Sequence, residues 1–273
     1  MPDKDRVFPA PPSARRFGFL LVFGLCFFLG ACATPPSDPT ARAAFDKTND
    51  PIEPTNRTIF AANDFLDKHT LKPVARAYRD HVPDLIQEGL HNVLANLQEP
   101  MIGLNDLLQG SPDRAWISFQ RFMLNTLIGG LGLVDVASGS GIPFHDADFG
   151  ETLGVWGIGE GPYVMLPVFG PSNIRDAVGI GAGFVLDPLG FVGGTNALYA
   201  GYARSGANAI DDRADQLDNL DELERDSVDF YAKLRSVYRQ HRMFQIKDAK
   251  GESTATDIDS GSVDVGTPEL SEP

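Results

Sequence analysis

Residues 112–128 form the segment that most constrains the fold of this chain. Polar side chains recur there at spacings of four, three and four residues, which places them on one narrow strip of a helix. These are Arg114, Ser118, Arg121 and Asn125. Nearly all other positions from 115 to 128 are apolar, whereas a helix at a water surface shows a wide polar face. The pattern is typical of a helix surrounded by core or lipid, with its strip turned to a cavity or a partner. The alternative is a central helix of a soluble bundle whose strip is exposed to water.

A second constraint lies near the N-terminus. Two arginines precede an apolar run over residues 17–29, which ends in the motif Leu29-Gly30-Ala31-Cys32. This motif resembles a bacterial lipobox, where the signal peptide is cut and the cysteine receives acyl chains. The run is shorter than the roughly 20 residues that a membrane-spanning helix needs. We predict that residues 1–31 are a signal peptide and that Cys32 is lipidated. The alternative is an ordinary secretory signal in which Cys32 carries no lipid.

The residue after Cys32 and the cysteine content refine this prediction. Ala33 rather than Asp follows the cysteine, a choice that favours export to the outer membrane in lipoproteins of the enterobacterial type. We therefore expect a protein anchored on the periplasmic face of the outer membrane, with no cofactor beyond the acyl and diacylglycerol groups of Cys32. The other cysteine, Cys26, lies inside the predicted signal peptide, which rules out a disulfide framework or a thiolate metal site after cleavage.

The charge of the chain limits the partners it binds. It has 23 Lys and Arg against 37 Asp and Glu, a formal net charge of −14. Nucleic-acid binding depends on phosphate contacts from basic side chains, so this balance argues against a nucleic-acid partner.

Helical periodicity dominates the region between two polar segments. Residues 32–49 form the lipidated N-terminus and a linker, and residues 249–273 form an acidic tail that we expect to be disordered. Between them, apolar residues recur at helical spacing over 86–97, 217–223 and 231–238. We predict an all-α fold with one helical domain over residues 50–248.

Helix-breaking residues concentrate between residues 135 and 154. They include Gly139, Gly141, Pro143, Gly150 and Gly154. A long loop in a compact domain is usually functional or disordered. A mobile gate and a plain surface loop are both compatible with this stretch.

Motifs of catalysis are missing from the sequence. A GxSxG nucleophile elbow is absent, and no histidine pair has zinc-ligand spacing. His145, Asp146 and Asp148 suggest a metal loop, but Gly150 and Thr152 break the calcium-binding pattern. We predict a protein that is not an enzyme and has no metal site.

Short motifs follow one another in a fixed order through residues 50–245. They are Asp50-Pro51-Ile52-Glu53, Asn56-Arg57-Thr58, Tyr78-Arg79-Asp80-His81-Val82-Pro83, Asn96-Leu97-Gln98-Glu99-Pro100, Leu108-Gln109-Gly110, Arg121-Phe122-Met123-Leu124-Asn125-Thr126, Phe149-Gly150-Glu151-Thr152-Leu153-Gly154 and Gly161-Pro162-Tyr163-Val164-Met165-Leu166-Pro167. Together they resemble the MlaA/VacJ family of outer-membrane lipoproteins. Pro54 departs from the family pattern, which has Gly before an aromatic residue, and this leaves the start of the first helix open.

The resemblance implies a single ring-like helical domain embedded in the inner leaflet of the outer membrane. In the family, an amphipathic channel takes phospholipid that has strayed into the outer leaflet and passes it to a soluble periplasmic carrier. The family also associates with trimeric porins. Carried over to this chain, the strip Arg114, Ser118, Arg121 and Asn125 becomes the channel wall, because a charged headgroup needs polar partners in hydrocarbon. Residues 135–154 become the gate. The alternative function is a structural or surface-associated lipoprotein without a lipid channel.

Overall fold

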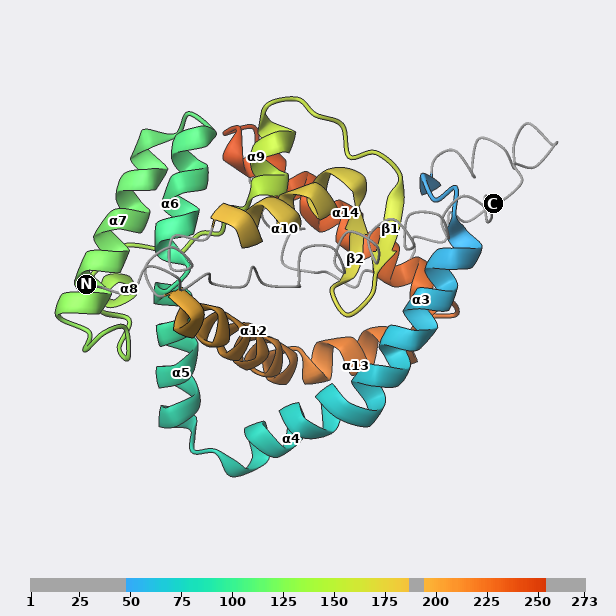
Figure 1. The fold of residues 1–273 in the computed structure, drawn as a ribbon, viewed down its shortest axis with the longest axis horizontal. Coiled ribbons are helices and arrows are strands. Elements are labelled where there is room, and N and C mark those ends of the chain that lie inside the picture. The colour runs from blue at the N-terminus through green and yellow to red at the C-terminus, as the bar shows by residue number, and fades with distance from the viewer. Residues whose placement is uncertain (1–47, 187–193, 254–273) are drawn as a thin grey trace, which may run out of the picture.

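Helices follow one another around the rim of a flattened, ring-like domain (Figure 1). The computed structural model describes residues 48–186 and 194–253. In Figure 1 the arc from α3 to α6 sweeps around one side, with α7 outside α6, and α9, α10 and α14 close the other side. The elements are α3 (Glu53–Leu66), the π-helical η2 (Asp67–Leu71), α4 (Lys72–His81), α5 (Asp84–Asn96), α6 (Glu99–Leu108), α7 (Pro112–Leu127), α8 (Val136–Gly139), α9 (Phe149–Val155), β1 (Tyr163–Leu166), β2 (Gly170–Asn173), α10 (Ile174–Leu186), α12 (Gly194–Asp215), α13 (Leu217–Arg225) and α14 (Phe230–Ala249). The predicted helical fold class is confirmed.

Prolines lie in the first turns of several of the described helices. Among them are Pro54 in α3, Pro100 in α6 and Pro112 in α7. The missing N–H of proline has no helical partner to lose there, and its fixed φ suits the helix. The first helix therefore begins at Glu53 with Pro54 built into it.

A small β-hairpin, which the sequence did not predict, interrupts the helices. Strands β1 and β2 pair antiparallel, with Tyr163 opposite Asn173. Val168 in the turn has a positive φ of 71°, a costly conformation for a β-branched residue. The side chain of Asn63 on α3 donates to the Leu166 carbonyl at 2.8 Å and accepts from the Val168 N–H at 2.9 Å. These two bonds fix the turn against α3.

The interpretation of residues 135–154 as one Gly-rich loop is wrong at both ends of the segment. Gly139 lies in α8, and Gly150 and Gly154 lie in α9. Only the connection between these helices, which contains Gly141 and Pro143, is irregular. The N-terminal aspartates explain the helices. Asp135 accepts from the Ser138 N–H, and Asp148 accepts from the Glu151 N–H. Such N-caps offset the low helix propensity of glycine.

Polar side chains occupy much of the interior, while large apolar side chains lie on the surface. A cluster of Tyr163, Met165 and Tyr231 packs against α3. Elsewhere the buried side chains include Glu99, Asp106, Arg121, Glu151 and Asp176. On the outside of α7, Trp116 is 57% exposed and Leu127 is 70% exposed, and the Trp116 and Phe119 rings stack with centroids 5.3 Å apart. Apolar exposure of this extent marks a surface that meets lipid or another protein.

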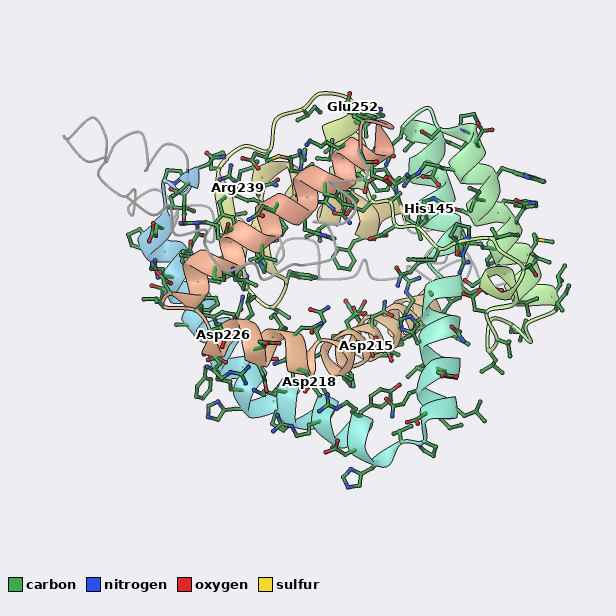
Figure 2. All side chains as sticks on the ribbon, turned by 180° about the vertical axis from the view of Figure 1, so that it is seen from behind. His145, Asp215, Asp218, Asp226, Arg239 and Glu252 are labelled. Atoms are coloured by element: carbon green, nitrogen blue, oxygen red, sulfur yellow. The ribbon has the colours of Figure 1, made fainter. Side chains whose placement is uncertain are left out.

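The lower edge of the domain in Figure 1 is joined by surface ion pairs. Lys68 bonds Glu224, Lys72 bonds Asp221 and Arg79 bonds Asp218 at 2.6, 2.6 and 2.9 Å. Figure 2 shows Asp218 on the helix α13 that faces α4 from inside the arc. Each exposed pair contributes little, but a row of them aligns α13 with the arc.

Several predictions concern parts of the chain outside the described residues. They are the signal peptide, the lipidated Cys32, most of the linker and the acidic tail beyond residue 253. Within the described parts, none of the helices combines the length and the apolar character needed to cross a membrane.

Candidate functional site

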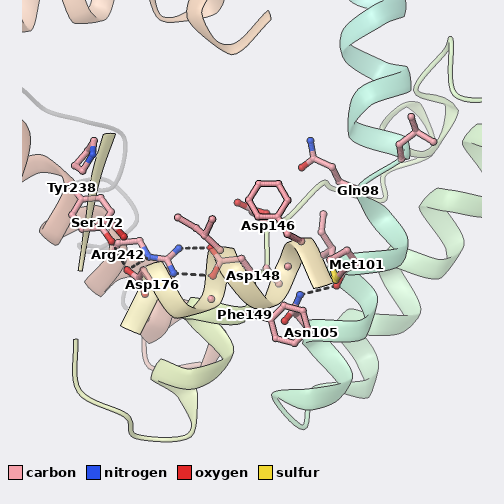
Figure 3. Close-up of a pocket in the computed structure, with 18 of the residues that line it drawn as sticks. Gln98, Met101, Asn105, Asp146, Asp148, Phe149, Ser172, Asp176, Tyr238 and Arg242 are labelled. Carbon is pink, nitrogen blue, oxygen red and sulfur yellow. Dashed lines mark hydrogen bonds and ion pairs between the residues drawn. The ribbon is translucent and has the colours of Figure 1, made fainter. Parts of the chain in front are cut away.

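A pocket of about 410 Å³ lies between α6, the segment entering α9, β2, α10 and α14 (Figure 3). One wall is apolar and comes mainly from α6, α9 and α10. It includes Leu97, Met101, Ile102, Phe149, Ile180 and Phe184. The polar lining residues include Asp146, Asp148, Asp176, Tyr238 and Arg242, and Arg204 of α12 also lines the pocket. The pocket is therefore amphipathic, and its volume lies in the range that holds a small ligand or part of a larger one.

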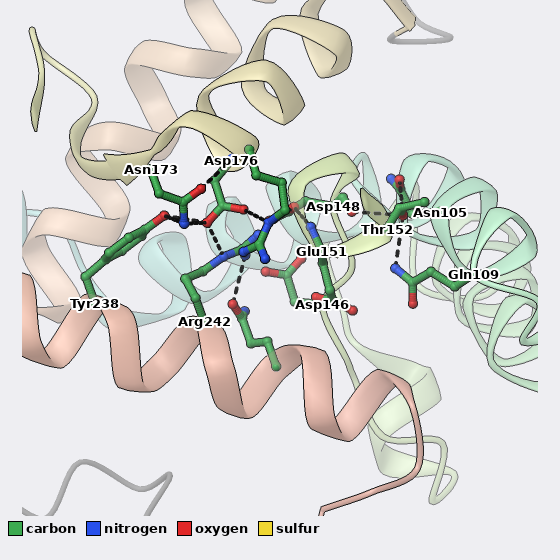
Figure 4. Close-up of polar contacts among 12 residues, drawn as sticks. Asn105, Gln109, Asp146, Asp148, Glu151, Thr152, Asn173, Asp176, Tyr238 and Arg242 are labelled. Carbon is green, nitrogen blue, oxygen red and sulfur yellow. Dashed lines mark hydrogen bonds and ion pairs between the residues drawn. The ribbon is translucent and has the colours of Figure 1, made fainter. Parts of the chain in front are cut away.

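Arg242 organises the polar end of the pocket (Figure 4). Its two terminal nitrogens donate to both carboxylate oxygens of Asp148 at 2.7 and 3.0 Å, and its Nε donates to Asp176 at 3.0 Å. Burial alone lowers the pKa of Arg242, but the hydrogen bonds and charges of these two carboxylates outweigh it and raise the pKa above its usual value. A bidentate pair of this kind fixes the guanidinium plane.

Asp176 is the second centre of this network. It accepts from Tyr238, from the side-chain amide of Asn173 at 2.7 Å and from the Nε of Arg175 at 2.8 Å. Burial raises the pKa of Asp176, but the hydrogen bond from Arg175 and the charge of Arg242 hold it below its usual range. The polar end is thus a prearranged set of charges, fixed before any ligand arrives.

Glu151 lies behind this end of the pocket as a buried acid. Its side chain is 1% exposed, and its Oε1 has no hydrogen-bond partner among the described residues. Burial, together with the charges of Asp148 and Asp146, raises the pKa of Glu151 to about 8. At neutral pH the protonated form of Glu151 therefore predominates, whereas a glutamate in water is ionised.

Glycines allow α9, α10 and α14 to meet closely beside the pocket. A Cβ on Gly179 would lie 2.3 Å from the backbone nitrogen of Gly150, and a Cβ on Gly150 would lie 2.6 Å from an Asp176 oxygen. A Cβ on Gly154 would overlap Ile246 at 2.6 Å. The predicted gate residues Gly150 and Gly154 are therefore packing positions in this structure. Gly139 and Gly141 have open space around them.

The polar strip of α7 turns inward, toward α6 and residues 135–142. Arg121, 2% exposed, donates to Glu99 at 2.6 Å, to Asp135 at 3.0 Å and to the Ile142 carbonyl at 2.6 Å. Asn125 donates to Asp135 and accepts from the Ala137 N–H, at 3.0 and 2.9 Å. Arg121 and Asn125 thus fix residues 135–142, the first part of the predicted gate, by hydrogen bonds.

The other two strip residues contact a different set of groups. Ser118 donates to Asp106 at 3.3 Å, and Arg114 pairs with Asp248 at 2.9 Å. The alternative of a strip exposed to water is wrong. None of the four strip residues is among those that line the pocket, and their contact with a headgroup stays a prediction.

A second stripe with the same spacing, on α14, was missed by sequence reasoning. It consists of Tyr231, Arg235, Tyr238 and Arg242. Tyr231 and Arg235 both donate to the buried Asp50, the latter at 2.6 Å. The spacing of four, three and four was visible in the sequence. The arginines did not stand out because α14 carries basic residues on its other faces as well.

Comparisons with known proteins agree with this architecture. The family model described as MlaA lipoprotein matches residues 48–245. The "Intermembrane phospholipid transport system lipoprotein MlaA" of Escherichia coli is 36% identical over 228 residues, covering 82% of this chain and 86% of the relative. The protein of the same name from Haemophilus influenzae is 36% identical over 207 residues, covering 74% and 81%.

A solved structure is also similar to this chain. It is described as "Structural basis for maintenance of bacterial outer membrane lipid asymmetry" and matches with a TM-score of 0.64 and 39% identity, covering 72% of this chain and 98% of the solved one. The resemblance inferred from the short motifs is confirmed: the chain belongs to the MlaA lipoprotein family.

Proposed function

We propose that this protein removes mislocalised phospholipid from the outer leaflet of the outer membrane and passes it, intact, to a soluble periplasmic carrier. The relatives from E. coli and H. influenzae are named for phospholipid transport. The observation that carries the proposal is an amphipathic pocket inside a domain whose outward side chains on α7 and α10 are apolar.

The outward apolar side chains support a position within the inner leaflet. Phe119 and Leu127 on α7, like Val178 and Val185 on α10, are each more than half exposed. Contact with acyl chains would remove this surface from water at a gain of about 25 cal/mol per Å². The proposed acyl groups on Cys32 then act as an anchor in addition to the embedded faces. A trimeric porin is the proposed partner within the membrane.

The pocket supplies what a lipid with a charged headgroup needs. A phosphate that enters hydrocarbon without polar partners is strongly destabilised. Here Arg242, Arg204 and Tyr238 line the pocket, and Met101 and Phe184 offer apolar contacts in the same pocket. A volume of about 410 Å³ suits one part of a phospholipid at a time, which is what passage, rather than storage, requires. Transport by this route involves no bond cleavage.

Two glycines of α10 provide a matched test. Gly183 lines the pocket, whereas Gly181 does not, and a Cβ at either position meets nothing within 4 Å. Gly183→Phe should fill the pocket without disturbing the helix. Gly181→Phe adds the same side chain to the same helix outside the pocket. Both replace a glycine that lowers helix stability.

We expect Gly183→Phe to fail to restore outer-membrane asymmetry in a deletion strain, while Gly181→Phe restores it. The measurement is the amount of intact phospholipid in the outer leaflet, with both variants checked for equal amounts in the outer-membrane fraction. Normal asymmetry with Gly183→Phe would contradict the pocket as the route. Lysophospholipid produced by the purified wild-type protein would indicate an enzyme. Normal asymmetry in the deletion strain itself would favour a structural lipoprotein.

A further inference from the structure

Two helices bring a histidine and two aspartates together outside the pocket. His91 lies on α5, and Asp211 and Asp215 lie one turn apart on α12. Figure 2 shows Asp215 on α12, the helix that packs beside α4 and α5. One imidazole nitrogen and one oxygen from each carboxylate lie within 4.8 Å of one another. His91 Nδ1 is 2.8 Å from Asp211 Oδ2 and 3.8 Å from Asp215 Oδ2.

These separations suit donors that share one ion. Two donors at about 2.1 Å from the same metal lie roughly 3 to 4 Å apart. The distance from His91 to Asp215 lies within this range and the distance from His91 to Asp211 lies just below it, so small side-chain rotations bring all three donors onto one sphere. Asp211 is 6% exposed and Asp215 is 65% exposed. The site therefore has one fixed carboxylate and one adjustable carboxylate at the surface, which leaves an open side for water.

The buried carboxylate has an orienting partner, as metal ligands usually do. Tyr78 on α4 donates from its hydroxyl to Asp211 Oδ1 at 3.1 Å, opposite the oxygen that faces His91. A bond of this kind fixes the direction in which a ligand presents its free oxygen.

The charge at this site also favours a cation. The end of α12 carries Asp211, Asp212 and Asp215. A divalent ion between Asp211 and Asp215 offsets the repulsion of two neighbouring carboxylates. Imidazole combined with carboxylates is a ligand set for zinc and neighbouring divalent transition metals.

We propose that His91, Asp211 and Asp215 bind a divalent transition-metal ion of the zinc class, which joins α12 to α5. Tyr78 is the positioning residue for Asp211. The ion stabilises the contact between the arc and α12, the helix that contributes Arg204 to the pocket. This inference does not depend on the proposed lipid transport.

The test uses the full mature chain in detergent, without a histidine tag, and ZnCl₂ as the probe. Calorimetric titration measures stoichiometry and affinity, and Co²⁺ absorption reports nitrogen and oxygen ligation. We expect one ion per chain and a rise in the melting temperature that a chelator reverses. His91→Gln and Asp215→Asn should each weaken Zn²⁺ binding at least roughly 10-fold, with a smaller loss for Tyr78→Phe.

His81→Gln is the matched control. His81 is an exposed histidine at the end of α4 whose Nδ1 lies 2.9 Å from the Ala77 carbonyl of its own helix. It should bind Zn²⁺ as the wild type does. The proposal is overturned if the wild type binds no Zn²⁺ at micromolar concentration, if His91→Gln binds it unchanged, or if His81→Gln loses it equally. Circular dichroism of the metal-free variants separates a lost ligand from a lost fold.

Discussion

Helices α7 and α14 carry the same stripe of polar side chains but turn opposite kinds of surface outward. On α7, the stripe from Arg114 to Asn125 faces the interior, and Trp116 and Leu127 point away from it. On α14, the stripe from Tyr231 to Arg242 is also turned inward, but the outer face carries Lys and Gln side chains. A stripe at this spacing therefore identifies the inner face of either helix. The composition of the other face distinguishes the two helices, because it is apolar on α7 and polar on α14.

The largest expected effect comes from removing the central arginine of the α7 stripe. Arg121→Met leaves Glu99 buried without its 2.6 Å partner. Breaking a buried ion pair on one side costs about 3–5 kcal/mol of unfolding free energy. Arg114→Met is the control, because its partner Asp248 lies at the surface, and its buried partner Asp106 keeps its contacts with Ser118 and His145. We expect a smaller loss, of about 1–2 kcal/mol. The measurement is denaturant unfolding in detergent.

Arg242→Met on α14 extends this comparison. This substitution leaves the buried Asp176 without Arg242 as an ion-pair partner. The other partner, Asp148, is about half exposed, so water can solvate its carboxylate. We expect a loss between those of the two α7 variants. Adding Glu99→Gln to Arg121→Met should restore much of the lost stability, because no buried charge then remains. If Arg121→Met unfolds at the wild-type denaturant concentration, the stripe is not the structural network described above.

A buried acid beside the α14 stripe should make stability fall with rising pH. Glu151, unlike Glu99, has no hydrogen bond from a basic side chain among the described residues, and its pKa is raised from 4.5 to about 8. A carboxyl whose folded-state pKa is raised stabilises the fold fully below pH 4.5, and this contribution is lost as pH rises toward 8. Asp148, Asp146, Arg242 and Arg114 are the charged groups that act on it.

Glu151→Gln isolates this effect. The difference in unfolding free energy between the variant and the wild type should change by on the order of 4 kcal/mol between pH 4.5 and 8, with the wild type losing stability relative to the variant as pH rises. Parallel pH profiles for the two proteins would show that the pKa of Glu151 is the same in the folded and unfolded states, which would contradict the prediction. Arg121 variants should leave this profile in place, since Arg121 lies at the other stripe.

The sequence allowed prediction of one stripe, the helical fold and the family, but not the pocket. The α7 stripe could be recognised because the residues around it are apolar. Arg235 and Arg242 could not be recognised because other positions of α14 also carry charged side chains. The pocket combines residues far apart in the chain, and the Asp148–Arg242 pair spans 94 positions. Periodicity reports the inner face of a single helix and carries no information about which inner faces meet. The same limit applied to Gly150 and Gly154, whose close neighbours come from α10 and α14.

The smallest expected effect concerns the glycine opposite each stripe. Gly150 on α9 faces the α14 stripe, and a Cβ there would lie 2.9 Å from an Arg242 nitrogen and 2.9 Å from the Asp176 backbone. Gly103 on α6 faces the α7 stripe, and its Cβ would meet the Ser118 Cβ at 3.4 Å, an ordinary contact. Only the α14 stripe therefore needs a glycine as its neighbour.

We expect Gly150→Ala to lower the unfolding free energy by about 1–3 kcal/mol, because the backbone of α10 cannot move aside without repacking. Gly103→Ala should leave stability unchanged or raise it by up to about 1 kcal/mol, since alanine favours the helix interior. Unfolding of both variants under the same conditions gives the comparison directly. Equal losses would mean that α6 and α7 are packed as tightly as α9 and α14.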